Sequence, residues 1–137
     1  MANGHISNAF ADILLKAWLT RDISLLPSSY WVDLTMVLPS DNAGLGLISP
    51  TGCRRIELVA NNASWASMGA GSRSMDTTID VLFDIATVDW GQILGYSLYD
   101  GPVSGLFLGY GVTNPYTIKA GMRARLPAGL IVISLPF

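Results

Sequence analysis

Charged residues are scarce in this 137-residue chain. Lysine, arginine, aspartate and glutamate make up 13% of the sequence, about half of the ~25% typical of soluble domains. Half of the residues are hydrophobic, so apolar surface outside the core has to be covered, and we expect protein partners to cover it. The formal net charge of −2 supplies no basic surface to neutralise phosphates, which argues against binding to nucleic acid.

Cysteine and histidine occur once each, as Cys53 and His5. A single cysteine cannot form an internal disulfide, and the two residues are too few ligands for a structural zinc site. A catalytic nucleophile needs a base, and His5 lies in a weakly tethered N-terminal segment. We therefore predict that the chain is not an enzyme and holds no cofactor or metal. Cys53 is interpreted as a small apolar filler rather than a reactive thiol.

Long hydrophobic runs are also missing. No stretch of 18 or more apolar residues is free of charged or turn-forming residues, so we predict no membrane-spanning helix and no membrane partner. The first apolar segment lacks the basic region and the Ala-x-Ala site of a secretory signal. The apolar residues are therefore assigned to a folded core and to protein contacts.

Four aspartates are closely spaced, at positions 76, 80, 84 and 89. Such carboxylates can hold Ca²⁺ or serve as an acid and a base. Strand alternation, however, places Asp80 and Asp84 on the face opposite the apolar Ile79, Val81 and Phe83, and no EF-hand spacing accompanies them. We interpret these aspartates as part of a solvated strand face.

The first regular element is a helix, predicted over residues 6–19. Its apolar residues recur three or four positions apart and fall on one face. Ser7 or Asn8 can cap its start, and Pro27 prevents its extension. We expect this face to pack within the subunit or against another subunit. The residues assigned to that packing are Ile6, Phe10, Ile13, Leu14 and Trp18.

The rest of the chain, residues 29–137, consists of short predicted strands between turns. About eight strands recur at roughly 8–12-residue spacing, each bounded by Gly, Pro, Asn or Asp. That pattern is typical of an antiparallel β-sandwich, here jelly-roll-like, rather than of βαβ units. We predict a single domain over residues 1–137, mainly β with one N-terminal α-helix.

Local patterns add three predictions. Residues 30–38 alternate in hydrophobicity, which predicts a half-buried strand with Asp33 and Thr35 on its open face. Asn-Pro at positions 114–115 is predicted to interrupt a strand. Segment 67–74, rich in small residues, is predicted to be the most flexible loop.

Aromatic residues leave one alternative function open. Four tryptophans and five tyrosines could supply a stacking platform for sugars, which would make the chain a carbohydrate-binding module for host recognition. Trp18 falls on the helix stripe and Tyr30 on an alternating strand, so these rings fit core or subunit contacts better.

Several short motifs follow one another in a characteristic order. After the N-terminal helix come Tyr-Trp-Val-Asp-Leu at 30–34, a Pro-to-Gly loop at 39–44, Arg-Ile-Glu-Leu at 55–58, Trp65, a segment ending in Trp-Gly at 81–91, Gly-Tyr-Ser-Leu-Tyr-Asp at 95–100, Gly-Leu-Phe-Leu-Gly-Tyr-Gly at 105–111 and Ala-Gly-Leu-Ile-Val-Ile-Ser-Leu at 128–135. In this order the motifs resemble a family of small virion structural proteins of tailed bacteriophages. That family includes head-decoration, minor-capsid and tail-fibre-like proteins.

The resemblance implies a structural role without catalysis. The function expected first is a capsid decoration or minor capsid protein that binds the capsid surface, in virions assembled in the host cytoplasm. Its expected partners are the major capsid protein or other virion proteins, together with further copies of itself. A trimer is the favoured homo-oligomer, because it suits the local three-fold positions of an icosahedral shell. The alternative placement is the tail, as a fibre, baseplate or adaptor protein of the same fold.

Overall fold

The computed structural model describes residues 4–38, 46–69 and 74–134. The turn predicted at 39–44 lies outside the described residues, as do residues 70–73 of the loop predicted at 67–74. The structural statements below concern the described residues.

The described residues form mainly strands and one α-helix, which confirms the predicted mainly β fold with one N-terminal α-helix. Turns rich in glycine separate most of the strands, as the spacing of turn residues predicts. The elements in chain order are β1 (Gly4–Ile6), α1 (Asn8–Thr20), the 3-10 helix η1 (Ile23–Leu25), β2 (Ser29–Thr35), β3 (Ile56–Val59), β4 (Trp65–Ser67), β5 (Ser74–Thr77), β6 (Val81–Ile85), β7 (Gly91–Tyr99), β8 (Phe107–Ile118), β9 (Arg123–Leu126) and β10 (Val132–Ser134).

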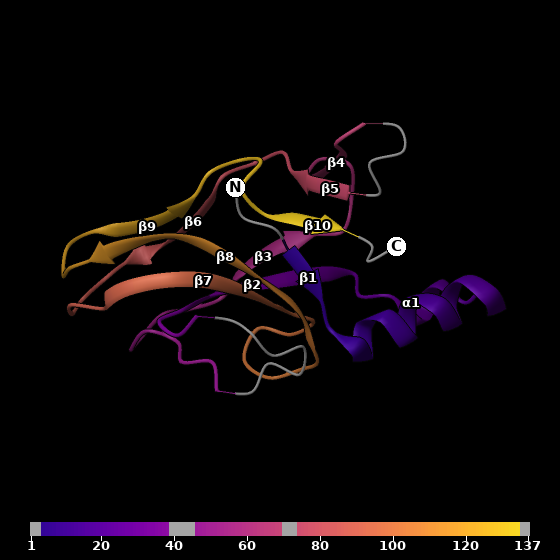
Figure 1. Ribbon diagram of the computed structural model, residues 1–137, viewed down its shortest axis with the longest axis horizontal. Coiled ribbons are helices and arrows are strands. Elements are labelled where there is room, and N and C mark those ends of the chain that lie inside the picture. Colours follow the sequence, from indigo (N-terminus) through magenta and orange to yellow (C-terminus); the bar gives the residue numbers. More distant parts are fainter. Residues whose placement is uncertain (1–3, 39–45, 70–73, 135–137) are drawn as a thin grey trace.

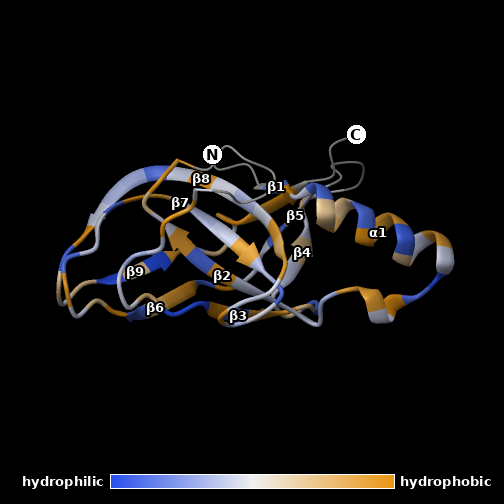
Figure 2. Ribbon diagram, turned by 90° about the horizontal axis from the view of Figure 1, so that it is seen from below, coloured by the Kyte–Doolittle hydropathy of each residue, from blue (hydrophilic) through white to orange (hydrophobic). Residues whose placement is uncertain are grey.

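The strands form two sheets of unequal size. Eight of the described strands make one large sheet in the order β3-β2-β7-β8-β1-β10-β5-β4, and β6 pairs with β9 in a separate two-stranded sheet. Figure 1 and Figure 2 show the β6–β9 sheet lying over one end of β7 and β8, which gives the predicted sandwich-like arrangement. Among the described pairings, β1 and β10 alone run parallel, in the middle of the large sheet.

The β7–β8 hairpin corrects the prediction that Asn114 and Pro115 interrupt a strand. β8 continues through both residues. Its register with β7 shifts between Ile93 and Gly95, at the level of this dipeptide. A proline has no N–H to donate to a ladder, and a bulge is one of the places in a sheet where none is required. Asn-Pro therefore alters the pairing here without ending the strand.

The prediction that β2 leaves one face open is wrong, because Asp33 and Thr35 are both buried. The Asp33 carboxylate accepts hydrogen bonds from the Leu34 N–H at 2.8 Å and from the Ser49 hydroxyl at 2.6 Å. The Arg55 Nε lies 3.6 Å from the same carboxylate. The segment that carries Ser49 and Arg55 therefore covers this face and supplies the partners that a buried carboxylate requires.

Arg55 also connects this segment to the β7–β8 turn. Its guanidinium lies 3.7 Å from the centre of the Tyr99 ring, in cation–π geometry. Its Nη1 donates to the carbonyl oxygens of Gly101 at 2.9 Å and Ser104 at 3.2 Å. One side chain thus holds β2, β7 and the turn together.

The core lies between the two sheets and continues along the large sheet toward α1. Tyr96 of β7 packs across Gly111, its register partner on β8. A Cβ at position 111 would collide with the Tyr96 ring, so glycine is what allows this contact. The largest fully buried side chains are Tyr96, Phe83, Leu34, Leu58, Ile93, Leu98, Leu108, Leu126 and Ile131.

Helix α1 begins two residues later than predicted, because Ile6 belongs to β1. Its N-cap is Ser7, which confirms one of the two caps predicted from the sequence. The Ser7 hydroxyl oxygen accepts from the Phe10 N–H at 3.1 Å, which satisfies one of the free donors of the first turn. The same hydroxyl donates to the Phe107 carbonyl at 2.7 Å. One buried serine therefore starts the helix and attaches it to β8.

The helix ends well before Pro27. Arg21 adopts a left-handed conformation with φ of 58°, and the Asp22 N–H donates back to the Ala17 carbonyl at 3.0 Å. This is a left-handed C-cap built without glycine. Across the described ranges, no helix is both long and apolar enough to cross a membrane.

Candidate functional site

Helix α1 projects beyond the sheets (Figures 1 and 2), and the residues predicted to pack on its stripe have different surroundings. Phe10 is buried, and Ile13 and Leu14 are half-buried. Ile6 is half-buried in β1, and Trp18 is 75% exposed. The structure thus brings Phe10, Ile13 and Leu14 against the body and leaves Trp18 in solvent.

A second apolar surface lies at the far end of the helix. Leu15, Trp18, Leu19 of α1 and Ile23 of η1 are 51%, 75%, 68% and 79% exposed. We call these four side chains the apolar tip. Single exposed apolar residues are ordinary, but a group of four large ones on a projecting element marks a contact surface.

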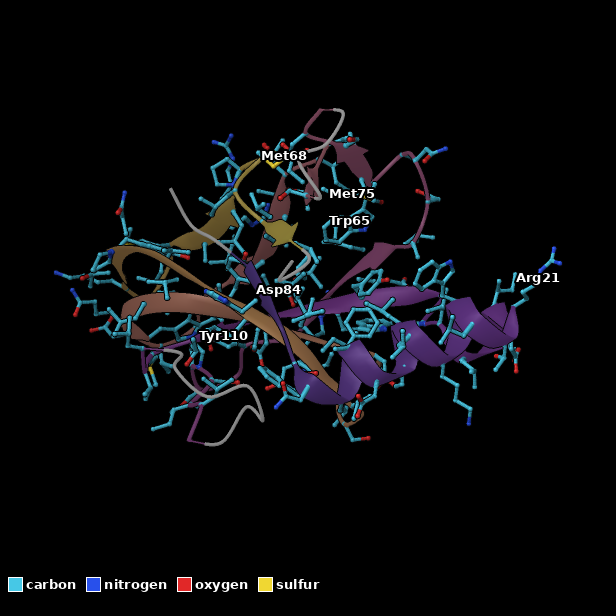
Figure 3. The ribbon with its side chains drawn as sticks, turned by 45° about the vertical axis from the view of Figure 1, so that its right-hand side comes forward. Arg21, Trp65, Met68, Met75, Asp84 and Tyr110 are labelled. Atoms are coloured by element: carbon cyan, nitrogen blue, oxygen red, sulfur yellow. The ribbon has the colours of Figure 1, made fainter. Side chains whose placement is uncertain are left out.

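An apolar groove of about 740 Å³ runs beside the other face of the helix. Its walls are the inner face of α1 and the β4–β5 hairpin, whose Trp65 and Met75 are labelled in Figure 3. Leu98 and Leu108 of the large sheet also line it. We call this space the apolar groove; it is lined by Phe10, Leu14, Tyr30, Ala60, Asn61, Asn62, Trp65, Ser67, Gly69, Ser74, Met75, Leu98, Leu108 and Ile133.

Aromatic rings form one side of the groove. Phe10 and Tyr30 meet edge to face with centroids 6.1 Å apart, and Tyr30 and Trp65 meet in the same way at 5.5 Å. These contacts link α1, β2 and β4. Burial raises the pKa of the Tyr30 hydroxyl. None of the described residues that line the groove carries a formal charge, so the space is suited to neutral apolar side chains.

Asp80, Asp84 and Asp89 are exposed, as predicted for a solvated face, whereas Asp76 of β5 is half-buried. Asp84 pairs with Arg54, whose Nε lies 2.9 Å from the carboxylate, and this hydrogen bond lowers the pKa of Asp84. Asp80 accepts from the Ala128 N–H at 2.8 Å and pairs with Arg125 at 3.0 Å, which together lower the pKa of Asp80. Within the three described ranges, no group of three His, Cys, Asp or Glu side chains is arranged to hold a metal ion.

The single cysteine is packed into the fold, and the single histidine stacks on an aromatic ring of the large sheet. Burial, reinforced by the charge of Asp33, raises the pKa of the Cys53 thiol to about 12. The thiol therefore stays protonated at neutral pH and acts as the predicted filler. His5 stacks on the ring of Tyr110 at 5.0 Å, across the β1–β8 pairing.

The predicted stripe includes the inner face of the helix and Trp18 of the tip, but not Leu15, Leu19, Ile23 or the groove residues outside α1. Leu15 and Leu19, four positions apart and off the predicted stripe, are a signal of the apolar tip that was present in the sequence. The groove had no such signal. It exists because the short β4–β5 hairpin lies at the edge of the large sheet, opposite α1. No local sequence pattern predicts how far apart the hairpin and the helix lie.

Fold and surface together define a class of protein: a small, mainly β structural domain whose most prominent surface features are an apolar tip and an apolar groove. The family model described as podophage GP4 fiber I protein gp80 matches residues 5–134, almost the whole chain. The chain therefore belongs to this family of phage fibre-like structural proteins, which confirms the resemblance to tailed-phage virion structural proteins. No curated protein matches the chain.

Proposed function

We propose that the protein is a tail-associated fibre component of a podophage particle. The observation that carries the proposal is the match of residues 5–134 to a family described as a fibre protein. That description favours the tail, the alternative in the sequence-based prediction, over the capsid surface that was expected first. The role is structural rather than catalytic, and the location is the virion.

The surface supports a role in assembly. A fibre component has to bind neighbouring virion proteins, and the apolar tip offers four large side chains to such a neighbour. Burying them removes apolar area from water, which stabilises an interface by roughly 25 cal/mol per Å² before the costs of association. The partners are accordingly other virion proteins, including further copies of this chain.

Immunogold labelling of intact particles tests the placement. An antibody raised against the chain should label the tail region of particles viewed by electron microscopy. Labelling over the head would instead support the capsid decoration role, and intact particles that carry the chain nowhere would overturn a virion function.

A carbohydrate-binding role for host recognition remains a second candidate because Trp18 is exposed. Trp65 and Trp90 are buried and cannot act as stacking platforms. Trp31 is half-buried, so Trp18 is the most exposed of the four tryptophans and the first to test. A glycan array separates the two candidates. Binding that is lost in Trp18→Ala favours recognition, and an array without binding leaves the structural role alone.

A further inference from the structure

The apolar tip and the apolar groove are matched in chemistry. The tip presents four aliphatic or aromatic side chains, and the described residues that line the groove carry no formal charge. Docking one into the other therefore buries apolar surface, and none of these described residues has a charge that would lose its water. The groove volume of about 740 Å³ is also within the roughly 300–1,000 Å³ of ordinary binding clefts.

The tip has the spacing of a helix that binds in a groove. Leu15, Trp18 and Leu19 occupy positions i, i+3 and i+4 of α1, the anchor pattern by which an amphipathic helix places one face in an apolar groove. Ile23 of η1, just beyond the C-cap, adds a fourth exposed apolar side chain. The residues that face the body, among them Phe10 and Ala17, lie on a different side of the helix.

The tip cannot fill the groove of its own molecule. Phe10 and Leu14 of α1 already form one wall of that groove, and Leu15 and Leu19 face away from them on the same rigid helix. The occupant must therefore come from another molecule. A second copy of this chain carries a surface of the required length, spacing and apolar character.

The areas are consistent with a stable contact between copies. From the exposed fractions of its four residues, the tip presents roughly 400–500 Å² of apolar surface, as large as the biggest patch on a typical monomer. When each copy inserts its tip into the partner's groove and receives the partner's tip in its own groove, each copy buries both its tip and its groove. The total then approaches the ~1,200 Å² at which specific interfaces begin.

We infer that the apolar tip of one copy occupies the apolar groove of a second copy and joins the chains into a homo-oligomer. This inference rests on the proposed fibre function and specifies one of its contacts. Two such contacts related by a two-fold axis close a dimer, and a head-to-tail series closes a ring.

Single substitutions on each side of the contact test the inference. Trp18→Glu places a charge on the tip, and Met75→Glu places one in the groove wall. Ala60→Trp, at the exposed rim, fills the groove by a different route and replaces Met75→Glu if that variant fails to fold. Val103→Glu is the matched control, because Val103 is 85% exposed in the β7–β8 turn and lies in neither surface.

Light scattering after size exclusion, with circular dichroism as the check of folding, should find the wild type and Val103→Glu as oligomers of the 14.7 kDa chain. Tip and groove variants should be folded, and the concentration below which they dissociate should be at least roughly 30-fold higher than that of the wild type. Mixing Trp18→Glu with a folded groove variant should restore a heterodimer, since the first keeps its groove and the second keeps its tip. A monomeric wild type at roughly 0.1 mM, or a Trp18→Glu variant that assembles like wild type, would overturn the inference.

The outcome is independent of the particle test. If the antibody labels the phage tail but the purified chain stays monomeric, the tip-in-groove contact is wrong and the fibre function is still supported. If the purified chain assembles through the tip but is absent from particles, the contact is supported and the fibre function is wrong.

Discussion

The two ends of the large sheet differ in how completely they bury their apolar side chains. At the β6–β9 end a second sheet covers the first, and Val81, Phe83 and Leu126 are almost fully buried. At the α1 end the cover consists of one helix and one short hairpin, with the apolar groove between them. Trp18 at the tip is exposed to solvent.

The difference teaches how one chain divides its apolar residues between stability and contact. A strand pair packed face to face over a sheet closes the core by itself. A helix buries only a stripe, and α1 is apolar over more of its circumference than the body covers. The β6–β9 end therefore stabilises the subunit, and the α1 end is left to bind a neighbour. The predictions below test this division.

The largest effect is expected at the covered end. Phe83→Ala removes a ring that is 1% exposed between the two sheets and should lower the free energy of unfolding by about 4 kcal/mol. Leu19→Ala, at the exposed tip, should change it by less than about 0.5 kcal/mol in the dilute monomer. Urea denaturation followed by tryptophan fluorescence measures both. Equal losses would show that the two ends do not differ.

The next effect concerns the cover over β2. Asp33→Ala leaves the half-buried Arg55 without its carboxylate and should cost about 3 kcal/mol of unfolding free energy. Asp12→Ala, an exposed residue of α1, is the control and should be close to neutral. Thermal and urea unfolding of both variants supply the measurement. A neutral Asp33→Ala would mean that the segment around Arg55 contributes little to the covered part of the sheet.

A smaller effect is expected where α1 joins the sheet. Ser7→Ala loses the N-cap and leaves the Phe107 carbonyl without its hydroxyl donor, which should cost about 1–2 kcal/mol. Thr20→Ala also removes a hydroxyl, but an exposed one that donates to the Lys16 carbonyl, so it should cost much less. Helical circular dichroism during urea unfolding measures the difference. Identical curves for the two variants would contradict the role of Ser7 as an anchor.

The smallest effect is the dependence of stability on pH at the exposed carboxylates. The pKa of Asp84 in the folded chain is lowered by Arg54, so its pairing contributes stability above the unfolded pKa of about 3.9. That contribution is lost as the pH falls through the folded value. The wild type should therefore melt slightly above Asp84→Asn at neutral pH, and the gap should vanish in acid and shrink in salt. A gap that widens on acidification would reverse the assigned sign.

Local chemistry was predictable from the sequence to the extent that neighbours along the chain determine it. The helix and its Ser7 cap follow from spacing and residue type, and the outward face of Asp80 and Asp84 follows from alternation. Burial of Asp33 was not predictable, because Arg55 and Ser49 reach it from a distant segment. The prediction that Pro115 interrupts a strand was wrong for a related reason. The register with β7, which is set by distant residues, decides whether a proline ends a strand or occupies a bulge.

The parallel pairing of β1 with β10 gives the subunit a mechanical property. Gly4 lies opposite Ile133, and both strands run in the same direction in the middle of the large sheet. Tension applied to the chain before β1 and after β10 would pull the two strands past each other along their length. Their hydrogen bonds, and those that tie them to β8 and β5, would then bear the load together rather than one at a time. Resistance to pulling is governed by the rate of unfolding, so this arrangement suits a part that has to transmit force.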